Sequence, residues 1–214
     1  MKKCSVENCN RKHYGLGYCQ KHYQQILKYG TILERNSKDP NEIIIEKQIC
    51  RMKLYNNLCE EIAETEFDLK YKEQIEKFKW FLKDGYVECN WCNENNKWQK
   101  MKLHQAIIYL SGQIIENNQE IDHKDTNRLN NLEDNLRICT KAQNSHNQKI
   151  KSNNTSGYKG VTFHKRNKKY QAQIVINNKQ KHLGTFKEIE DAARAYNAAA
   201  IKYHGEFAVL NNIE

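Results

Sequence analysis

The sequence predicts an α+β protein built from several small domains. Charged residues make up 29% of the 214 residues, so the chain is too polar for one large hydrophobic core. Its first part is rich in cysteine and histidine, and its last part alternates apolar with polar residues before turning helical. We therefore expect a small module at 1–30, a helical connector at 31–74, a central domain at 75–150, a linker at 151–157 and a sheet-plus-helix domain at 158–214.

Positive charge is concentrated at both ends of the chain. Residues 1–35 contain seven Lys and Arg against two Asp and Glu, and residues 152–214 contain ten against five. Residues 36–151 are nearly neutral, with eighteen against nineteen. Because basic surfaces attract polyanions, we expect both ends to approach nucleic acid while the middle performs another task.

The expected compartment is the cytoplasm. No apolar stretch approaches the ~18 residues of a membrane span, and the polar beginning of the chain lacks the apolar part of a signal peptide. In a reducing compartment, the eight cysteines indicate metal ligands before disulfides. We therefore expect no membrane partner; the oligomeric state stays open, with a monomer slightly favoured.

A metal site is predicted in the first module. Cys4, Cys9, Cys19 and His22 follow the spacing C-x4-C-x9-C-x2-H. Three thiolates and an imidazole form the ligand set of a closed, tetrahedral, structural Zn²⁺ site. A segment with so few apolar side chains needs such a metal to fold. The segment resembles small zinc modules found at the front of phage HNH endonucleases.

The connector is expected to be helical. Asp39, Pro40 and Glu42 match the N-cap, N1 and N3 positions of a helix start. Apolar residues then recur at helical spacing, which predicts a helix over 40–64. These residues are Ile45, Ile49, Met52, Cys59, Ile62 and Ala63.

The central domain is predicted to combine short strands with short helices. Strands are expected around residues 80–87, a helix at 103–110, a strand–loop–strand unit at 119–139, and a helix beginning after Thr140. Cys89 and Cys92 have the C-x2-C spacing of a zinc ligand pair but no convincing partner pair. A second zinc site at these two cysteines is therefore left open.

The region 119–149 carries the residue types that metal-dependent phosphodiester hydrolysis requires. The reaction needs an activated water, neutralised phosphate charge and a stabilised leaving oxygen, and a divalent ion supplies the last two. Carboxylate and amide oxygens suit Mg²⁺, while a neutral histidine accepts a proton near pH 7. The region offers Asp122-His123, Asn135-Leu136-Arg137 and Asn144.

These residues resemble the HNH nuclease motif, a ββα-metal unit of strand, loop, strand and helix around one metal ion. Asn135 follows His123 by twelve residues, and Asn144 follows Asn135 by nine. The resemblance implies that Asp122 and Asn144 hold Mg²⁺ or Mn²⁺. It also implies that His123 is the general base and that Asn135 orients the His123 ring. The remaining asparagines of the loop are interpreted as turn residues: Asn127, Asn130 and Asn131.

Two features of the motif stay open. His146 lies two residues beyond Asn144, and positions two apart on a helix point about 200° away from each other. Only one of these two side chains can therefore face the metal easily, and Asn144 is favoured. Asp122 and His123 are adjacent, and neighbouring residues of a regular strand face opposite sides. The strand must therefore end or bulge there.

The last domain is predicted to be a three-stranded sheet covered on one face by a helix. Strands are expected at about 158–164, 170–176 and 180–186, and a helix at 188–203. The helix carries one apolar stripe: Ile189, Ala192, Ala193, Tyr196, Ala199, Ala200 and Tyr203. The uncovered face of the sheet then has the polar and basic character of a surface that enters a DNA major groove.

Residues 157–212 resemble the plant ethylene-response-factor DNA-binding domain. The segments that carry the resemblance are Gly157-Tyr158-Lys159-Gly160-Val161, Leu183-Gly184-Thr185-Phe186 and the alanine-rich run 192–200. The family reads the major groove with its sheet, which implies double-stranded DNA as the partner. Motif position implies groove contacts by Thr162, His164, Gln171, Gln173 and Val175. Charge and location add phosphate contacts by Arg166, Lys168, Lys169 and Lys181. The arginines and tryptophan of the plant strands are absent, so the plant target sequence is not transferred.

The sequence thus predicts a site-selective DNA endonuclease of the HNH type, phage-like or homing-like, acting in a bacterial or phage-infected host cell. It would use Mg²⁺ or Mn²⁺ for hydrolysis, Zn²⁺ for structure and no small-molecule substrate. The alternative is a DNA-binding regulator with an inactive HNH fold, and a third interpretation is RNA binding. Metal-dependent plasmid cleavage separates the first two, and competition with RNA tests the third.

Overall fold

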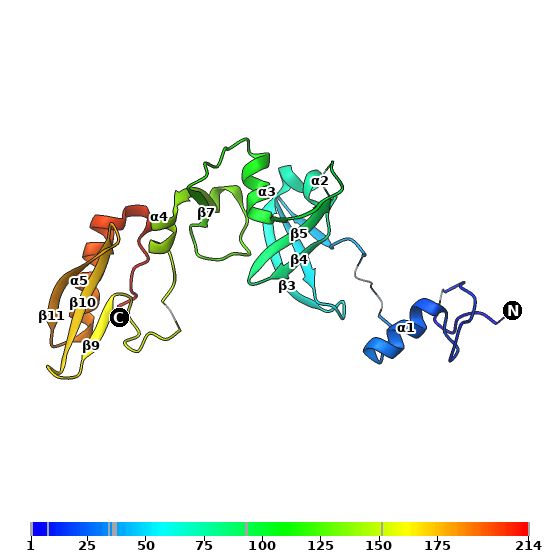
Figure 1. The fold of residues 1–214 in the computed structure, drawn as a ribbon, viewed down its shortest axis with the longest axis horizontal. Helices are drawn as coiled ribbons and strands as arrows, with labels where there is room; N and C mark the ends of the chain where they lie inside the picture. Colours follow the sequence, from blue (N-terminus) through cyan, green and yellow to red (C-terminus); the bar gives the residue numbers. More distant parts are fainter. Residues whose placement is uncertain are drawn as a thin grey trace. The chain divides into compact units, whose positions relative to one another are not determined.

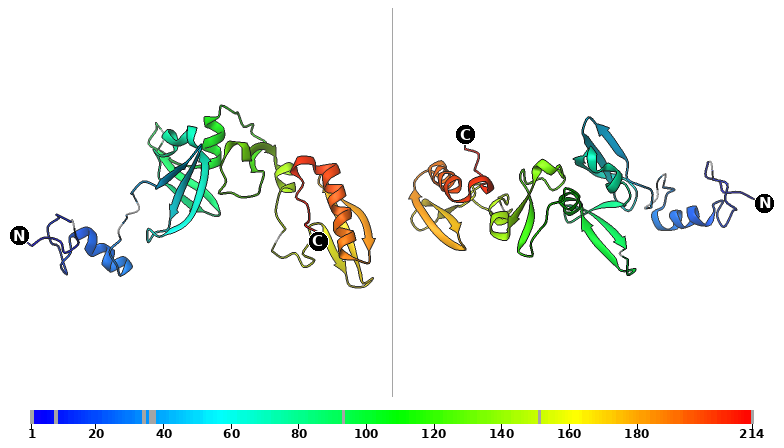
Figure 2. Two further views of the ribbon diagram at one scale, coloured as in Figure 1. Left: turned by 180° about the vertical axis from the view of Figure 1, so that it is seen from behind. Right: turned by 90° about the horizontal axis from the view of Figure 1, so that it is seen from above.

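The computed structural model describes residues 2–7, 9–33, 35, 38–92, 94–150 and 152–213. The chain divides into two compact units, residues 1–103 and 104–214. Within the described ranges it forms four small sheets and several short helices, which confirms a mixed α+β architecture (Figure 1, Figure 2). The division between the units falls inside the domain predicted at 75–150. No helix in these ranges is long and apolar enough to cross a membrane.

The first unit opens with a small module around one helix. Backbone bridges pair Lys3 with Lys12 and Gly15 with Tyr18. Helix α1 (Gln20–Tyr29) begins directly after Cys19, which is its N-cap residue. His22 therefore lies in the first turn of α1, close to the two cysteine-bearing turns that precede the helix.

The connector is a sheet, so the predicted helix over 40–64 is wrong. Its antiparallel strands are β1 (Ile43–Glu46), β2 (Ile49–Tyr55) and β3 (Glu61–Asp68). Along β2, fully buried Cys50, Met52 and Leu54 alternate with more exposed residues, which is the two-residue period of a strand. Asp39 and Pro40 precede β1 instead of starting a helix. The side chain of Asn41 bonds the backbone of Lys53 and of Trp80 at the start of the next sheet.

A second sheet completes the first unit. Its strands are β4 (Trp80–Lys83), β5 (Tyr86–Cys92) and β6 (Trp98–Lys102), in the order β4-β5-β6. The turn η1 (Leu69–Tyr71) and the helix α2 (Lys72–Ile75) lead into it. Trp80 is buried and its indole donates to the carbonyl of Ile75 at 2.8 Å, which fixes the strand against the helix.

The strand–loop–strand–helix unit predicted after residue 119 is confirmed. Helix α3 (Leu103–Leu110) precedes it. The unit consists of β7 (Gln119–His123), η2 (Glu133–Asn135), β8 (Leu136–Thr140) and α4 (Lys141–His146). Thr140 caps α4 as predicted, because its side chain accepts from the Gln143 amide while the Gln143 side chain accepts from the Thr140 amide.

The three strands and the helix predicted for the last domain are also confirmed. They are β9 (Val161–His164), β10 (Lys169–Ile176), β11 (Lys179–Phe186) and α5 (Ile189–His204), followed by the turn η3 (Gly205–Phe207). Alanines of α5 lie on the buried face of the sheet against Val161, Ala172 and Ile174. Gly160 has a positive φ of 73°, and a Cβ there would meet the Tyr196 ring at 2.0 Å. Lys151, the first residue of the predicted linker, lies outside the described residues.

Candidate functional site

The centre of the candidate site is the end of β7. In the β7–β8 pair, Asp122 lies opposite Arg137 and His123 lies opposite Leu136. The strand ends at His123, whose carbonyl accepts from the amide of Thr126 at 2.8 Å, and Thr126 has a positive φ of 63°. The Asp122 and His123 side chains are both buried, at 6% and 5% exposure. The strand thus stops where the motif requires it to stop.

The Asp122 carboxylate is held by two neighbours. Arg137 donates to Oδ2 through Nη2 at 2.7 Å and through Nε at 2.9 Å. The Asn147 amide donates to Oδ1 and Oδ2, both at 2.9 Å, and to the His123 carbonyl at 2.8 Å. Arg137 is itself fixed by the Glu206 carbonyl at 2.9 Å and lies 3.7 Å from the Phe207 ring centre. The carboxylate therefore has one defined orientation.

Asn144, the predicted ligand, lies beside a different carboxylate. Its Nδ2 donates to Glu120 Oε2 at 2.6 Å. Glu120 and Asp122 share one face of β7 because a strand repeats every two residues, whereas Asn144 and Asn147 share one helical face because they are three apart. The structure therefore pairs Asn144 with Glu120 and Asn147 with Asp122. The sequence signal for Asn147 is its position three residues after Asn144, which the spacing of the HNH motif does not include.

His146 does not face Asp122. Its ring stacks on the ring of His204, with centres 3.6 Å apart and planes 8° from parallel. This agrees with the angular argument that residues two apart on a helix point in different directions. Burial, together with nearby His204 and Lys159, lowers the pKa of His146.

The His123 ring is oriented by Asn131, which sequence reasoning had placed among the turn residues. Asn131 is 1% exposed and its Oδ1 lies 3.2 Å from His123 Nε2. Since an amide oxygen only accepts, Nε2 carries the proton and Nδ1 keeps its lone pair. His104 packs edge-on against the same ring at 5.1 Å. Burial lowers the pKa of His123, although the Asn131 bond and nearby carboxylates partly offset it, so the ring is neutral at neutral pH.

Asn135 orders the loop instead of contacting the His123 ring. Its Nδ2 donates to Asp125 Oδ1 at 2.9 Å and to the Asn130 carbonyl at 2.8 Å, and its Oδ1 accepts from the Asp125 amide. Burial disfavours the Asp125 carboxylate, but bonds from Asn127, Asn135 and Asn130 outweigh it and lower its pKa. The loop that presents Asn131 to His123 is thus built around Asp125. Asn135 therefore acts on the His123 ring only through the loop that carries Asn131.

The four residues predicted to bind Zn²⁺ lie together. Ligand atoms of Cys4, Cys9, Cys19 and His22 are all within 4.8 Å of one another. Cys9 Sγ and Cys19 Sγ are 3.9 Å apart, close to the ~3.8 Å that follows from tetrahedral Zn–S bonds of ~2.3 Å. Burial disfavours the Cys4 thiolate, but bonds to His22 and to backbone amides lower its pKa to about 6. The donor set and its spacing fit a closed zinc site.

Cys89 and Cys92 show no such grouping. Cys89 is fully buried, and burial raises its pKa to about 11, whereas Cys92 is exposed. Across the ranges that the structure describes, the only cluster of three or more potential Cys, His, Asp or Glu ligands is the one in the first module.

The uncovered face of the last sheet carries the predicted groove contacts. Thr162 lies opposite Gln171, and His164 lies opposite Lys169. Gln171 donates to Nδ1 of His182 at 3.0 Å, a residue that sequence reasoning missed. The predicted groove and phosphate contacts are all exposed or partly exposed: Thr162, His164, Arg166, Lys168, Lys169, Gln171, Gln173, Val175 and Lys181.

Lys181 belongs to the other face. It lies opposite the buried Ile174, so both side chains point toward α5. Its Nζ donates to the Tyr203 hydroxyl at 2.8 Å and lies 4.8 Å from the centre of that ring. Directly paired residues of neighbouring strands point to the same face of a sheet. Lys181 therefore lies on the face covered by α5 and not on the face of the groove contacts.

Two family models match separate parts of the chain. Residues 102–146 match a model described as HNH endonuclease, and residues 156–206 match the AP2 domain. The AP2-like ethylene-responsive transcription factor ANT of Arabidopsis thaliana is 48% identical over 62 residues. That match covers 28% of this chain and 11% of the plant protein, so the likeness is confined to one domain.

Viral relatives match over longer parts of the chain. A protein of Acanthamoeba polyphaga mimivirus, described as an uncharacterized HNH endonuclease, is 36% identical over 143 residues, covering 65% of this chain and 70% of the viral protein. Protein 3.8 of Escherichia phage T7 is 35% identical over 88 residues, covering 41% and 72%. From these matches and the strand–loop–strand–helix unit around Asp122 and His123, the chain belongs to the HNH endonuclease family and carries an AP2 domain.

Proposed function

We propose that this protein is a site-selective, metal-dependent DNA endonuclease whose HNH unit has the ββα-metal arrangement. The observation that carries the proposal is the buried grouping at the end of β7. There Asp122 lies within 2.9 Å of the Asn147 amide, and His123 is held at Nε2 by Asn131. A carboxylate and a neutral imidazole with a free lone pair thus lie on successive residues at the end of one strand.

The donor atoms of this grouping fit Mg²⁺ or Mn²⁺. Asp122 would supply a carboxylate oxygen. Asn147, in place of the Asn144 suggested by motif spacing, would supply its amide oxygen after its side chain turns, because its Nδ2 faces Asp122 and the His123 carbonyl in this structure. Such oxygen ligands suit hard cations that keep several waters. The ion would neutralise charge on the scissile phosphate and stabilise the leaving oxygen.

The protein's own residues account for the proton and the geometry. His123 Nδ1 takes a proton from a water molecule, whose oxygen forms the new bond to phosphorus as the bond to the leaving sugar oxygen breaks. Asn131 holds Nε2–H, so Nδ1 stays available to the water. Arg137 keeps the Asp122 carboxylate in one orientation, as partners of metal-binding carboxylates commonly do. The Asp125–Asn135 contacts hold the loop that carries Asn131.

The first module is proposed to be held by one structural Zn²⁺. We expect one tightly bound zinc per purified chain and its loss in Cys19→Ser, because a closed Cys₃His site needs all four ligands. Cys92→Ser is the matched control, since Cys92 is exposed and outside the cluster, and it should keep the zinc. Elemental analysis of protein purified without chelator measures both. Wild-type protein without zinc would contradict this assignment.

The AP2 domain is proposed to read duplex DNA with the uncovered face of its sheet. In a His123→Ala background, which should cut far more slowly, Gln171→Ala and Gln173→Ala are expected to reduce discrimination between a selected site and random DNA by about 1–3 kcal/mol. Affinity for random DNA should change less. Gln113→Ala, an exposed glutamine outside the sheet, is the matched control.

Binding isotherms on both DNAs at several salt concentrations measure these effects, because phosphate contacts make affinity salt-dependent. RNA competitors in the same assay separate DNA binding from RNA binding. If the His123→Ala parent and both glutamine variants discriminate equally between the two DNAs, this face of the sheet does not recognise the DNA sequence. Tighter binding to RNA would favour the RNA interpretation.

A further inference from the structure

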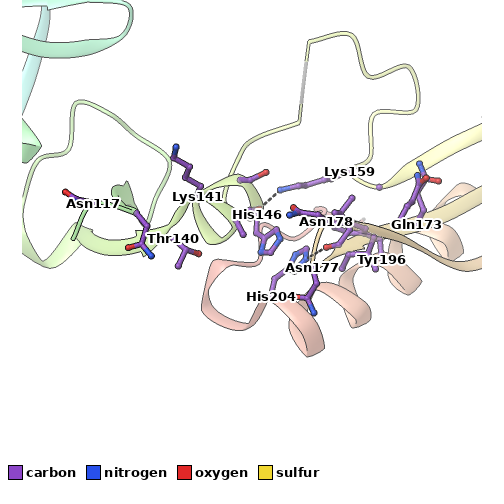
Figure 3. Close-up of a pocket in the computed structure, with 17 residues that line it drawn as sticks. Asn117, Thr140, Lys141, His146, Lys159, Gln173, Asn177, Asn178, Tyr196 and His204 are labelled. Atoms are coloured by element: carbon purple, nitrogen blue, oxygen red, sulfur yellow. Dashed lines mark hydrogen bonds between the residues drawn. The ribbon is translucent and has the colours of Figure 1, made fainter. Parts of the chain in front are cut away.

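A pocket of about 820 Å³ lies inside the second unit, beside the end of α4, the turn between β10 and β11, and the end of α5 (Figure 3). Neither the proposed catalytic residues nor most of the groove-facing residues belong to it. Its lining combines cations, imidazoles and amides, and it contains no aspartate or glutamate. Its lining includes Lys141, His146, Lys159, Asn178 and His204.

His204 has an unsatisfied polar atom at this pocket. The residue is nine-tenths buried, and its Nε2 lies 2.9 Å from the Val175 carbonyl, to which it donates. Nδ1 is buried and has no hydrogen-bond partner among the described residues. Buried polar atoms are nearly always paired, so such an atom calls for a ligand or a solvent molecule. The stacked ring of His146 covers one side of His204 and lines the same pocket.

Lys159 adds a positive charge to the lining of the same pocket. Its Nζ donates to the carbonyls of His146 and Gln148, both at 2.6 Å. Burial lowers its pKa to about 8, so it remains mainly charged at neutral pH. No ion pair joins Lys159 to a carboxylate within the described ranges. The carbonyls at the end of α4 partly compensate this charge, as they do for cations at helix C-termini, and an anion in the pocket would add a further attraction.

We infer that this pocket binds a phosphate group of the DNA backbone between the segment read by the AP2 domain and the segment cut by the HNH unit. The inference rests on the proposed function. A phosphate would supply the anion that Lys159 lacks and would accept hydrogen bonds from the surrounding amides. A water molecule donating both to His204 Nδ1 and to that phosphate would satisfy the buried ring nitrogen. Because α4 and the β10–β11 turn both line the pocket, one bound phosphate would tie both domains to the same DNA.

Asn178→Asp tests this with the smallest possible change. Asn178 lies in the β10–β11 turn with φ 61°, a conformation that aspartate also tolerates, and the substitution adds one negative charge to the pocket. Asn96→Asp is the matched control, since Asn96 is an exposed turn residue with φ 55° that does not line the pocket. Lys141→Gln, at an exposed pocket residue, removes a positive charge instead.

Binding of the full chain to a fluorescent DNA duplex is measured in the His123→Ala background over a series of salt concentrations. We expect Asn178→Asp and Lys141→Gln to weaken binding several-fold and to lower the slope of log affinity against log salt by about one. Asn96→Asp should match the parent. Equal affinities and slopes for the parent, Asn178→Asp and Lys141→Gln would overturn the inference.

Two further results would separate a free-anion site from a DNA phosphate site, and the pocket from the proposed function. Inorganic phosphate that raises the Tm of the parent but not of Asn178→Asp, with DNA binding equal in both, would assign the pocket to a free anion and overturn the inference. A parent chain that binds no duplex DNA would contradict both the inference and the proposed function. If the parent binds duplex DNA and the pocket variants bind it equally well, the phosphate site in the pocket is contradicted but the proposed function is not.

Discussion

His123→Ala is expected to lower the rate of DNA cleavage about 10²–10⁴-fold, the usual contribution of a positioned base, while DNA affinity stays near that of wild type. His123 is the imidazole next to Asp122, and its Nδ1 is the atom left available by the bond between Nε2 and Asn131. Single-turnover cleavage at saturating protein measures the chemical step, and a binding assay on the same duplex measures affinity.

A graded variant sharpens this test. Asn131→Ala keeps the imidazole but removes the acceptor that fixes its orientation, so its rate should lie between those of wild type and His123→Ala. Because Asn131 is fully buried, the Tm of this variant must be measured beside its rate. A His123→Ala protein that cuts at the wild-type rate would show that a different group accepts the proton.

Asn147→Ala is expected to abolish most cleavage and to weaken Mn²⁺ binding about 10–100-fold or more, whereas Asn144→Ala keeps most of both. The reason is the register of α4 on β7. Asn147 contacts the Asp122 carboxylate and the His123 carbonyl, while Asn144 contacts Glu120. The two variants are chemically identical and three residues apart, so each is the control for the other.

Cleavage rates and a calorimetric or spin-resonance titration with Mn²⁺ distinguish them. The titration reports the metal site even if neither variant cuts. An inactive Asn144→Ala with an active Asn147→Ala would restore the ligand implied by motif spacing.

The parts of the fold that the sequence predicted are those with one dominant local signal. Thr140 caps the helix that was expected to begin after it, and the alternation of Ala172 and Ile174 with Gln171 and Gln173 defined the two faces of a strand. The helix prediction for the connector was wrong because its apolar residues fit both the helical period and the two-residue period of a strand. The spacing of Ile45, Ile49 and Met52 is that of one face of a helix. Cys50, Met52 and Leu54 lie in the core and alternate with more exposed residues, which is the spacing of a strand.

The candidate site was predicted at the level of its segments and less well at the level of single contacts. Asp122 and His123 lie at the end of β7, as the motif required. The partners of their side chains depend on how α4 and the loop after β7 pack, which linear spacing does not encode. The contacts of Asn131 with His123 and of Asn147 with Asp122 were therefore not predicted, although both residues are asparagines close to the motif. Lys181 was predicted as a phosphate contact from charge and location, and the side of the sheet on which it lies follows only from its cross-strand neighbour, Ile174.

Cleavage of supercoiled plasmid DNA with and without Mg²⁺ or Mn²⁺ tests the central claim most directly. Wild type should nick or linearise the plasmid only when the divalent ion is added. Asp122→Asn should lose this activity because the proposed ion loses its carboxylate ligand. Asp134→Asn, at an exposed aspartate of the same motif, should keep it. A wild-type chain that binds plasmid but leaves it intact with either ion would contradict the account and favour a DNA-binding regulator, and full activity in Asp122→Asn would contradict the assigned site.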